Sequence, residues 1–232
     1  MSDHIKRLRG FVDGMVQDRE SFRLLEAGCG SCSWLDLSDR ARVVGIDISE
    51  KQLERNELIH EAIHGDIMTH RFEPGSFDVI ISIDVLEHLE RPEEALANLR
   101  EALAPDGLLV LKLPNAMSWK GLFTKVTPHG LHVWVYRKFL GRPNAGIDDV
   151  GPFKTFMRMS ISPHALRHWG KRVGLTVAYE DYYQAIAQIR LRKKLGPLDL
   201  LVKLFDGLTR VLSFGRMSIS RTEYIIVLRN SI

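Results

Sequence analysis

Two glycines, Gly28 and Gly30, follow directly after a short apolar run over residues 22–25. Such a turn marks the passage from a strand to a helix. Because glycine has no Cβ, a ligand can approach the backbone closely, and the helix that follows offers free N–H groups. Asp47 ends the next apolar run, where an acid can accept both hydroxyls of a ribose. These features predict a nucleotide site, although glycines also serve simple turns. Ser33 stands where a dinucleotide-binding dehydrogenase needs a third glycine.

Further acidic residues follow the later apolar runs. Asp66 comes after a short run, and Asp84 comes after the nearly continuous run over residues 77–83. Taken alone, Asp66 also suits a helix N-cap or a turn. Glu87 and His88 come next, and two interpretations stay open for them. They form either the polar opening of the next helix or a part of the reactive site.

These residues need a scaffold that brings the ends of several strands together. Through about residue 115, short apolar runs alternate with amphipathic stretches of helical period. The run over residues 77–83 is typical of a central strand in a parallel sheet that is buried on both faces. Ser49 and Gln52 have the spacing of a capping box, which predicts a helix through about residue 60. The alternation predicts an α/β fold, a Rossmann-like, doubly wound and mostly parallel sheet of seven strands.

The chain is predicted to form one domain over residues 1–232. Its expected parts are an N-terminal helix at 1–20, a core at 21–115 with strands near 62–64 and 108–113 and a helix from Pro92, a lid at 116–160, a helix from Ser162 to Gly174, strands at 175–179 and 223–228, and a helical insertion at 184–216.

The core also carries a family resemblance. Glu26-Ala27-Gly28-Cys29-Gly30-Ser31-Cys32 resembles the acidic-x-Gly-x-Gly-x-Gly loop of class I S-adenosylmethionine-dependent methyltransferases, with Cys32 in place of the third glycine. The segments that resemble later family motifs, in order and at family spacing over residues 20–115, are Val44-Gly45-Ile46-Asp47-Ile48-Ser49, Gly65-Asp66-Ile67, Phe77-Asp78-Val79-Ile80, Asp84-Val85-Leu86-Glu87-His88-Leu89 and Leu103-Ala104-Pro105-Asp106-Gly107-Leu108-Leu109. The likeness is greatest to the small-molecule branch with the ubiquinone-biosynthesis O-methyltransferases.

The resemblance implies S-adenosylmethionine as the methyl donor and S-adenosylhomocysteine as the product. It assigns the donor's methionine part to Gly28 and Gly30, with Glu26 orienting the ammonium group. It also implies that Asp47 and Ile48 hold the ribose side, that Asp66 and Ile67 hold the adenine, and that Ile83 and Asp84 line the place where the methyl group faces the acceptor.

Methyl transfer from a sulfonium needs the acceptor, the methyl carbon and the sulfur in line, so much of the catalysis can come from alignment. A hydroxyl acceptor would also gain roughly 10²–10⁴-fold from a general base. His129 and His132 are the favoured candidates, because they follow the fifth predicted strand in the segment that the family uses over its substrate. His164, in the first turn of a helix, is a weaker candidate. Each of these histidines also suits a surface or packing role.

The predicted lid mixes basic and aromatic side chains, among them Arg137, Arg158 and Trp134. This composition suggests an acceptor with negative charge and an apolar or ring portion. A solvated basic surface over a local core would show the same composition.

Two further patterns have alternative interpretations. Cys29 and Cys32 have the spacing of a redox pair or half a zinc site, but two cysteines do not complete such a site, and no metal is predicted. The leucine-rich stretch over residues 198–212 follows the basic run at 190–194 and has helical spacing. Packing on its own domain is the usual role of such a stripe, while contact with a second subunit or a membrane surface is the minority interpretation.

Composition sets the remaining expectations. With 32 basic and 29 acidic residues the net charge is only +3, which gives no case for nucleic acid as a partner. The N-terminus lacks the pattern of a secretory signal, and a cytoplasmic location is expected. The predicted function is methyl transfer to a small molecule, with oxygen as the favoured acceptor atom. Nitrogen or carbon methylation, and a module that binds a nucleotide or a partner without catalysis, are the alternatives; the sequence does not give the oligomeric state.

Overall fold

The computed structural model describes residues 3–33, 35, 37, 40–116, 118, 127–138, 143–144, 153–185, 188–189, 196, 198–214, 218 and 220–231. The strands in this part of the chain are β1 (Phe22–Ala27), β2 (Ala41–Asp47), β3 (Glu61–His64), β4 (Phe77–Ile83), β5 (Leu103–Pro114), β6 (Leu175–Tyr183) and β7 (Glu223–Asn230). The helices are α1 (Asp3–Met15), α2 (Glu50–Leu53), η1 (Leu86–His88), α3 (Pro92–Ala102), α5 (His129–Lys138), η2 (Met159–Ile161), α6 (Pro163–Arg172) and α8 (Leu198–Leu212).

The described strands form one seven-stranded sheet in the order β3-β2-β1-β4-β5-β7-β6. Strands β3, β2, β1, β4 and β5 are parallel to one another. Strand β7 lies between β5 and β6 and runs antiparallel to both. The prediction of a Rossmann-like, mostly parallel sheet is therefore confirmed. The antiparallel β7 is long and buried, and it carries the apolar residues Tyr224 to Leu228 at the centre of this half of the sheet.

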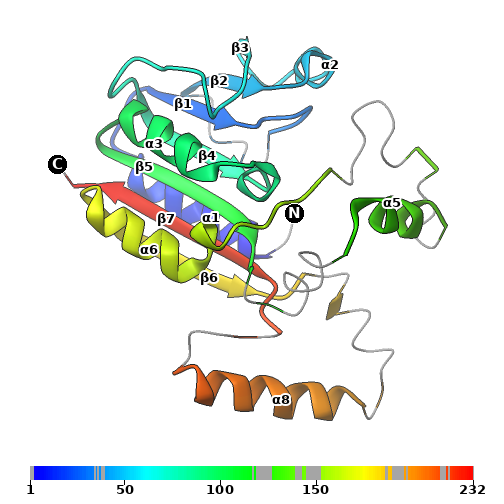
Figure 1. Ribbon diagram of the computed structural model, residues 1–232. Coiled ribbons are helices and arrows are strands. Elements are labelled where there is room, and N and C mark those ends of the chain that lie inside the picture. The colour runs from blue at the N-terminus through cyan, green and yellow to red at the C-terminus, as the bar shows by residue number, and fades with distance from the viewer. Residues whose placement is uncertain are drawn as a thin grey trace.

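Two hydrophobic clusters cover the two faces of the sheet (Figure 1). On one face, α3 and α6 contribute Leu96, Leu99 and Leu166. On the other face, α1 contributes Leu8 and Val12. Side chains buried on both faces explain why the central strands β4 and β5 are nearly continuous apolar runs.

The predicted helix from Ser49 to about residue 60 is mostly wrong, because α2 ends at Leu53. Ser49 does cap it, since its hydroxyl accepts the Gln52 N–H at 3.3 Å. Beyond the helix, the Asn56 side chain forms hydrogen bonds with two backbone groups. It donates to the Gly30 carbonyl and accepts the Leu58 N–H, both at 3.1 Å. An asparagine that bonds to nearby backbone in this way competes with the helix.

The other boundaries shift less. The first helix is shorter than predicted and ends at Met15, and β6 extends to Tyr183 because it pairs with β7 along its length. The fifth strand begins at Leu103 instead of 108, with a bulge between the pairs Phe77–Leu103 and Val79–Leu108. The turn predicted at Pro105-Asp106-Gly107 forms that bulge.

Candidate donor and acceptor site

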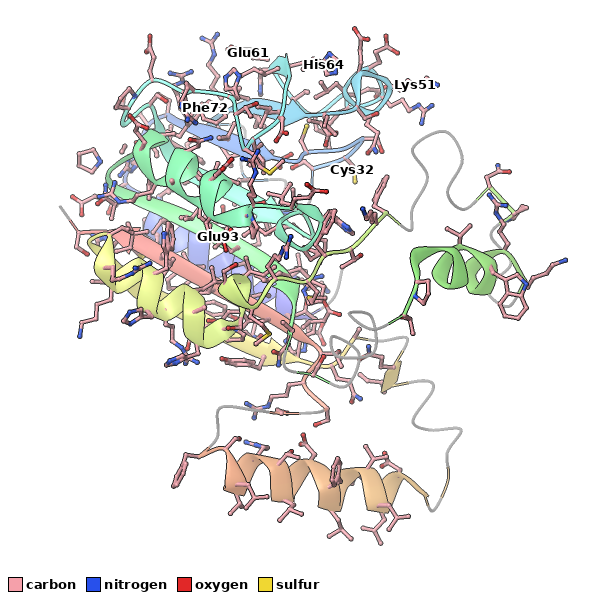
Figure 2. The ribbon with its side chains drawn as sticks, viewed as in Figure 1. Cys32, Lys51, Glu61, His64, Phe72 and Glu93 are labelled. Atoms are coloured by element: carbon pink, nitrogen blue, oxygen red, sulfur yellow. The ribbon has the colours of Figure 1, made fainter. Side chains whose placement is uncertain are left out.

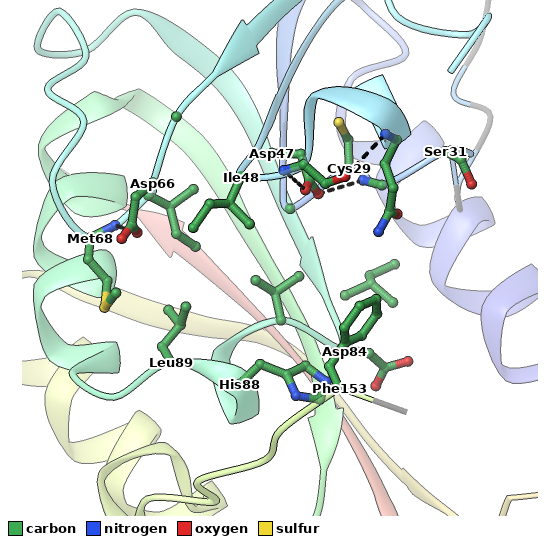
Figure 3. A pocket seen from close by; sticks show the side chains of 18 of the residues that line it. Cys29, Ser31, Asp47, Ile48, Asp66, Met68, Asp84, His88, Leu89 and Phe153 are labelled. Carbon is green, nitrogen blue, oxygen red and sulfur yellow. Dashed lines mark hydrogen bonds between the residues drawn. The ribbon is translucent and has the colours of Figure 1, made fainter. Parts of the chain in front are cut away.

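A cavity of about 650 Å³ opens at the carboxyl ends of the parallel strands (Figure 3). Its walls come from the segments after β1, β2, β3 and β4 and from residues 153–154. This is the point at which the strand order reverses between β1 and β4, where open α/β sheets bind ligands. The predicted cofactor residues that line it are Gly28, Gly30, Asp47, Ile48, Asp66, Ile67, Ile83 and Asp84. The volume lies within the usual range for small-molecule sites.

The loop after β1 requires its glycines. Gly28 and Gly30 have φ angles of 76° and 55°, which residues with a side chain rarely adopt. A Cβ at Gly28 would also lie 2.4 Å from Cγ2 of Val85, in the segment after β4. Cys32, at the position of the family's third glycine, is exposed at the cavity, so the loop forms without a glycine there.

Asp47 joins the first two loops at the cavity. One carboxylate oxygen accepts the Gly30 N–H at 2.8 Å, and the other accepts the Ser49 N–H at 2.9 Å. These bonds fix the orientation of the carboxylate. Each oxygen keeps a second lone pair, so the pair can still accept hydrogen bonds from two hydroxyls of a ligand.

Apolar side chains flank the middle of the cavity. Ile48 is 72% exposed although it is a large apolar residue, and it faces the cavity together with Ile67, Met68 and Leu89. Asp66 follows β3, and its carboxylate accepts the Met68 N–H at 2.8 Å. Figure 3 shows Asp66 and Asp47 on either side of Ile48. An apolar wall with an acceptor at its edge suits a flat heteroaromatic ring with an exocyclic amine.

Glu26 does not line the cavity but lies beneath the glycine loop, 4% exposed. One carboxylate oxygen accepts the hydroxyl of Ser33. The other is buried and has no hydrogen-bond partner among the described residues. Burial raises the pKa of Glu26 to about 7, and the bond from Ser33 opposes this shift. A buried acceptor beside the loop is what an ammonium group, directly or through water, would satisfy, so the site fits the methyl donor that the resemblance implies.

An ion cluster of Asp84, Lys112 and Glu223, in which Lys112 and Glu223 are largely buried, supports the other end of the cavity. Asp84 has a φ of 55°, and both of its carboxylate oxygens lie 2.6 Å from Nζ of Lys112. The same Nζ lies 2.9 Å from Glu223. Burial alone would lower the pKa of Lys112, but the two carboxylates outweigh it and raise this pKa. Glu87 is buried nearby, and desolvation followed by the charge of Asp84 raises its pKa.

His88 lies at the cavity, next to Asp84 and Phe153 in Figure 3. Its Nδ1 lies 2.8 Å from the carbonyl oxygen of Lys154, which can only accept, so Nδ1 carries the proton and donates. The lone pair of the neutral ring is then on Nε2, which lies 4.0 Å from a Glu87 carboxyl oxygen. A ring held in this tautomer can take up a proton at Nε2.

The end of the predicted lid, residues 153–158, is attached to η1. Its backbone N–H groups at Phe156 and Met157 both donate to the Glu87 carbonyl oxygen, at 2.8 and 3.2 Å. Arg158 Nε donates to the carbonyl oxygen of Glu90 at 3.1 Å. These bonds bring Phe153 and Lys154 to the cavity, 65 residues or more after η1 in the sequence. Both residues belong to the predicted lid, whose basic and aromatic side chains the sequence analysis connected with the acceptor.

The histidines predicted as general bases are not among the residues that the structure places at the cavity. His129 and His132 belong to α5, but their side chains lie outside the described residues. His164 is exposed in the first turn of α6 and is not a cavity residue. Of the predicted acceptor residues, Trp134 and Arg137 are exposed on α5, and Arg158 lies beside the cavity through its bond to Glu90.

The two cysteines are separate thiols. Cys29 is buried, and burial raises its pKa to about 12, with Asp47 and Glu26 contributing. Such a thiol is a poor nucleophile. The described residues contain no group of three or more His, Cys, Asp or Glu side chains that could hold a metal ion.

The strand order, the glycine loop after β1 and the carboxylates of Asp47 and Asp66 at the cavity are together those of a class I S-adenosylmethionine-dependent methyltransferase domain. The chain belongs to the family described as "Methyltransferase domain", which matches residues 1–180. It is distantly homologous to ubiquinone biosynthesis O-methyltransferases. The mitochondrial enzyme of that name from Schizosaccharomyces pombe is 27% identical over 157 residues, which cover 56% of this chain and 55% of the relative.

Other relatives differ in the acceptor that their names state. The 27-O-demethylrifamycin SV methyltransferase of Amycolatopsis mediterranei is 31% identical over 117 residues, or 45% of this chain and 43% of that protein. A putative sarcosine dimethylglycine methyltransferase from Galdieria sulphuraria has the same fold, with a TM-score of 0.60 at 14% identity over 98% of this chain and 84% of that one. The matches to these two curated relatives span about half of each relative's length.

Proposed function

We propose that this protein transfers the methyl group of S-adenosylmethionine to a hydroxyl oxygen of a small acceptor that contains a ring and carries negative charge. The observation that carries this proposal is His88, a histidine held at the cavity in the tautomer that can accept a proton. A base at this position is useful for a hydroxyl, whose proton must leave, and is needed less by an amine that is already neutral.

The donor, when bound, supplies a sulfonium methyl with a neutral thioether as leaving group. Asp47 would bind the ribose hydroxyls, Asp66 the adenine amine and Glu26 the ammonium group, which orients the methyl toward Asp84 and His88. During the transfer, Nε2 of His88 would take the proton that leaves the acceptor hydroxyl. A Glu87 carboxyl oxygen lies 4.0 Å from Nε2, and Glu87 would stabilise the resulting imidazolium when it is ionised, above its raised pKa.

Two neighbouring side chains support the chemistry of the acceptor. Phe153 is 45% exposed, faces the cavity and contacts His88 edge to face, with ring centroids 5.8 Å apart. It offers an aromatic surface to a ring in the acceptor. Lys154 supplies a cation at the same end of the cavity. Three other residues of the predicted lid are proposed to contact the acceptor as well: Arg158, Arg137 and Trp134.

The test is a set of acceptors assayed with wild-type protein and two variants. We expect phenols that carry a carboxylate to be methylated, and His88→Asn to lower kcat by roughly 10²–10⁴-fold while donor affinity stays unchanged. Lys154→Gln should raise KM for the charged phenols and leave the uncharged ones unaffected. Full activity of His88→Asn would contradict the role of His88 and return attention to His129 and His132, to be tested by the same substitution. Turnover of amines but not hydroxyls would favour nitrogen methylation.

A further inference from the structure

Helix α8 exposes an apolar face. Figure 1 shows this helix beyond the β6 edge of the sheet, separate from the layered body, and Figure 2 shows its outer side chains projecting away from that body. The large apolar residues along it and just after it are between 53% and 90% exposed: Leu200, Leu201, Leu204, Phe205, Leu208, Val211, Leu212 and Phe214. A cluster of this size is uncommon on a surface that faces only water.

The opposite face attaches the helix to the protein. Asp206 is 8% exposed, and its carboxylate accepts bonds from the Ser218 hydroxyl at 3.1 Å, the Ser220 N–H at 3.0 Å and the Ser220 hydroxyl at 2.7 Å. Both serines lie in the segment that leads into β7. The helix is therefore held by its polar side, which is the reverse of an amphipathic helix that packs on its own domain.

The two faces separate cleanly around the helix. At about 100° per residue, the exposed apolar residues from Leu200 to Leu212 occupy a sector of about 140°. Asp206 lies about 170° from the middle of this sector, with Lys203 and Arg210 on the same polar half. A helix with one broad apolar face and basic residues on the other has the form that lies in a membrane interface.

The charge of the segment around α8 indicates which kind of membrane surface it would bind. Residues 190–221 contain eight basic residues and two acidic ones, Asp199 and Asp206. Both acids are engaged, Asp199 with Lys203 at 2.9 Å and Asp206 with the serines. The rest of the chain has 24 basic and 27 acidic residues, so positive charge is concentrated in this segment. Such a concentration favours anionic lipid.

We propose that α8 lies in the interface of an anionic membrane, with its apolar face toward the acyl chains and Lys203 and Arg210 at the headgroups. The observations favour lipid over a second protein, because the apolar face is long and continuous, the other half of the helix carries Lys203 and Arg210, and residues 190–221 concentrate positive charge. In the described part of the chain, no helix is long and apolar enough to cross a bilayer, so the attachment would be peripheral.

The test uses the full chain and flotation with vesicles of phosphatidylcholine alone or mixed with phosphatidylglycerol. We expect wild-type protein to float only with the mixed vesicles, and added salt to weaken this binding. Leu204→Glu with Leu208→Glu should lower the partition coefficient at least about a hundredfold, because each substitution puts a charge in place of a leucine that would be buried among the acyl chains. Lys193→Gln with Lys194→Gln should lower binding to the mixed vesicles.

The matched control is Leu58→Glu, which makes the same change at an exposed leucine far from α8 in the sequence and should bind as wild type. Phe205→Trp adds a direct readout, with a blue shift of its fluorescence on the mixed vesicles. The proposal is overturned if wild-type protein does not bind anionic vesicles, or if the double glutamate variant binds as well as Leu58→Glu. It is also overturned if gel filtration shows a wild-type dimer that the double variant dissociates, with no vesicle binding; α8 would then join two copies.

Discussion

At the scale of single residues, Glu26 connects stability with donor binding. Its raised pKa means that the folded protein holds a proton that the unfolded chain releases between about pH 4.5 and pH 7. The folded state binds more protons in this window, so its stability decreases as pH rises through it. A shift of this size corresponds to about 3 kcal/mol of unfolding free energy.

Glu26→Gln should remove this dependence, because the amide keeps the shape without the charge. We expect the variant to gain up to about 3 kcal/mol relative to wild type between pH 5 and pH 8, measured by urea unfolding at both values. A difference that is the same at both pH values would mean that Glu26 titrates normally. In the same variant, S-adenosylmethionine affinity should be low and should no longer rise with pH through 7.

Lys112 neutralises two carboxylates that the fold places together, and its side chain is 12% exposed. Lys112→Met should destabilise the protein by about 3 kcal/mol, since the buried carboxylate of Glu223 would lose the cation that lies 2.9 Å from it. Adding Glu223→Gln should restore part of this loss. Denaturant unfolding of the two variants measures both effects, and equal stability of Lys112→Met and wild type would contradict the role of the cluster.

At the scale of elements, the loop after β1 depends on the segment after β4. Gly28→Ala should place a methyl group against Val85 and force an unfavourable φ, which costs about 1–3 kcal/mol. Val85→Ala added to it should recover only the part due to the contact, because the backbone strain remains. Thermal unfolding and donor binding of the single and double variants check this; full recovery would show that the strain is negligible.

The elements also show what could be predicted from sequence. Apolar runs and glycine turns predicted the inner strands of the core, because β1, β2, β4 and β5 are buried along most of their length. The helix after Ser49 was overestimated, since the capping pattern marks a start, and the side-chain bonds of Asn56 that end it depend on the distant Gly30. The extent of β6 was underestimated, because pairing with β7 sets it.

The site, like the fold, has a part that local sequence predicts and a part that contacts between distant segments determine. Gly28, Gly30, Asp47 and Asp66 could be placed from the sequence because each lies at or just after the end of β1, β2 or β3, and the ends of parallel strands meet at one edge. The contacts of His88 with Lys154, and of Asp84 with Lys112 and Glu223, join segments far apart in the chain. No local pattern signals them, so the acceptor end was predicted poorly.

At the scale of the whole molecule, the methyltransferase domain has two separable surfaces. The donor cavity lies at the carboxyl ends of the parallel strands, and α8 lies beyond the β6 edge (Figure 1). Substitutions on the exposed face of α8 should therefore leave donor affinity unchanged. Calorimetry with S-adenosylmethionine on the Leu204→Glu, Leu208→Glu variant measures this, and a tenfold weaker affinity would show that the two surfaces are coupled.

The central claim is that the cavity binds S-adenosylmethionine through Asp47, and calorimetry tests it most directly. Wild-type protein should bind S-adenosylmethionine and S-adenosylhomocysteine, and Asp47→Ala should weaken both at least about tenfold, because charge-assisted bonds to the ribose are lost. Glu57→Ala, which removes an exposed carboxylate outside the cavity, should bind as wild type. Absence of binding to the wild type, or equal binding by Asp47→Ala, would contradict the account.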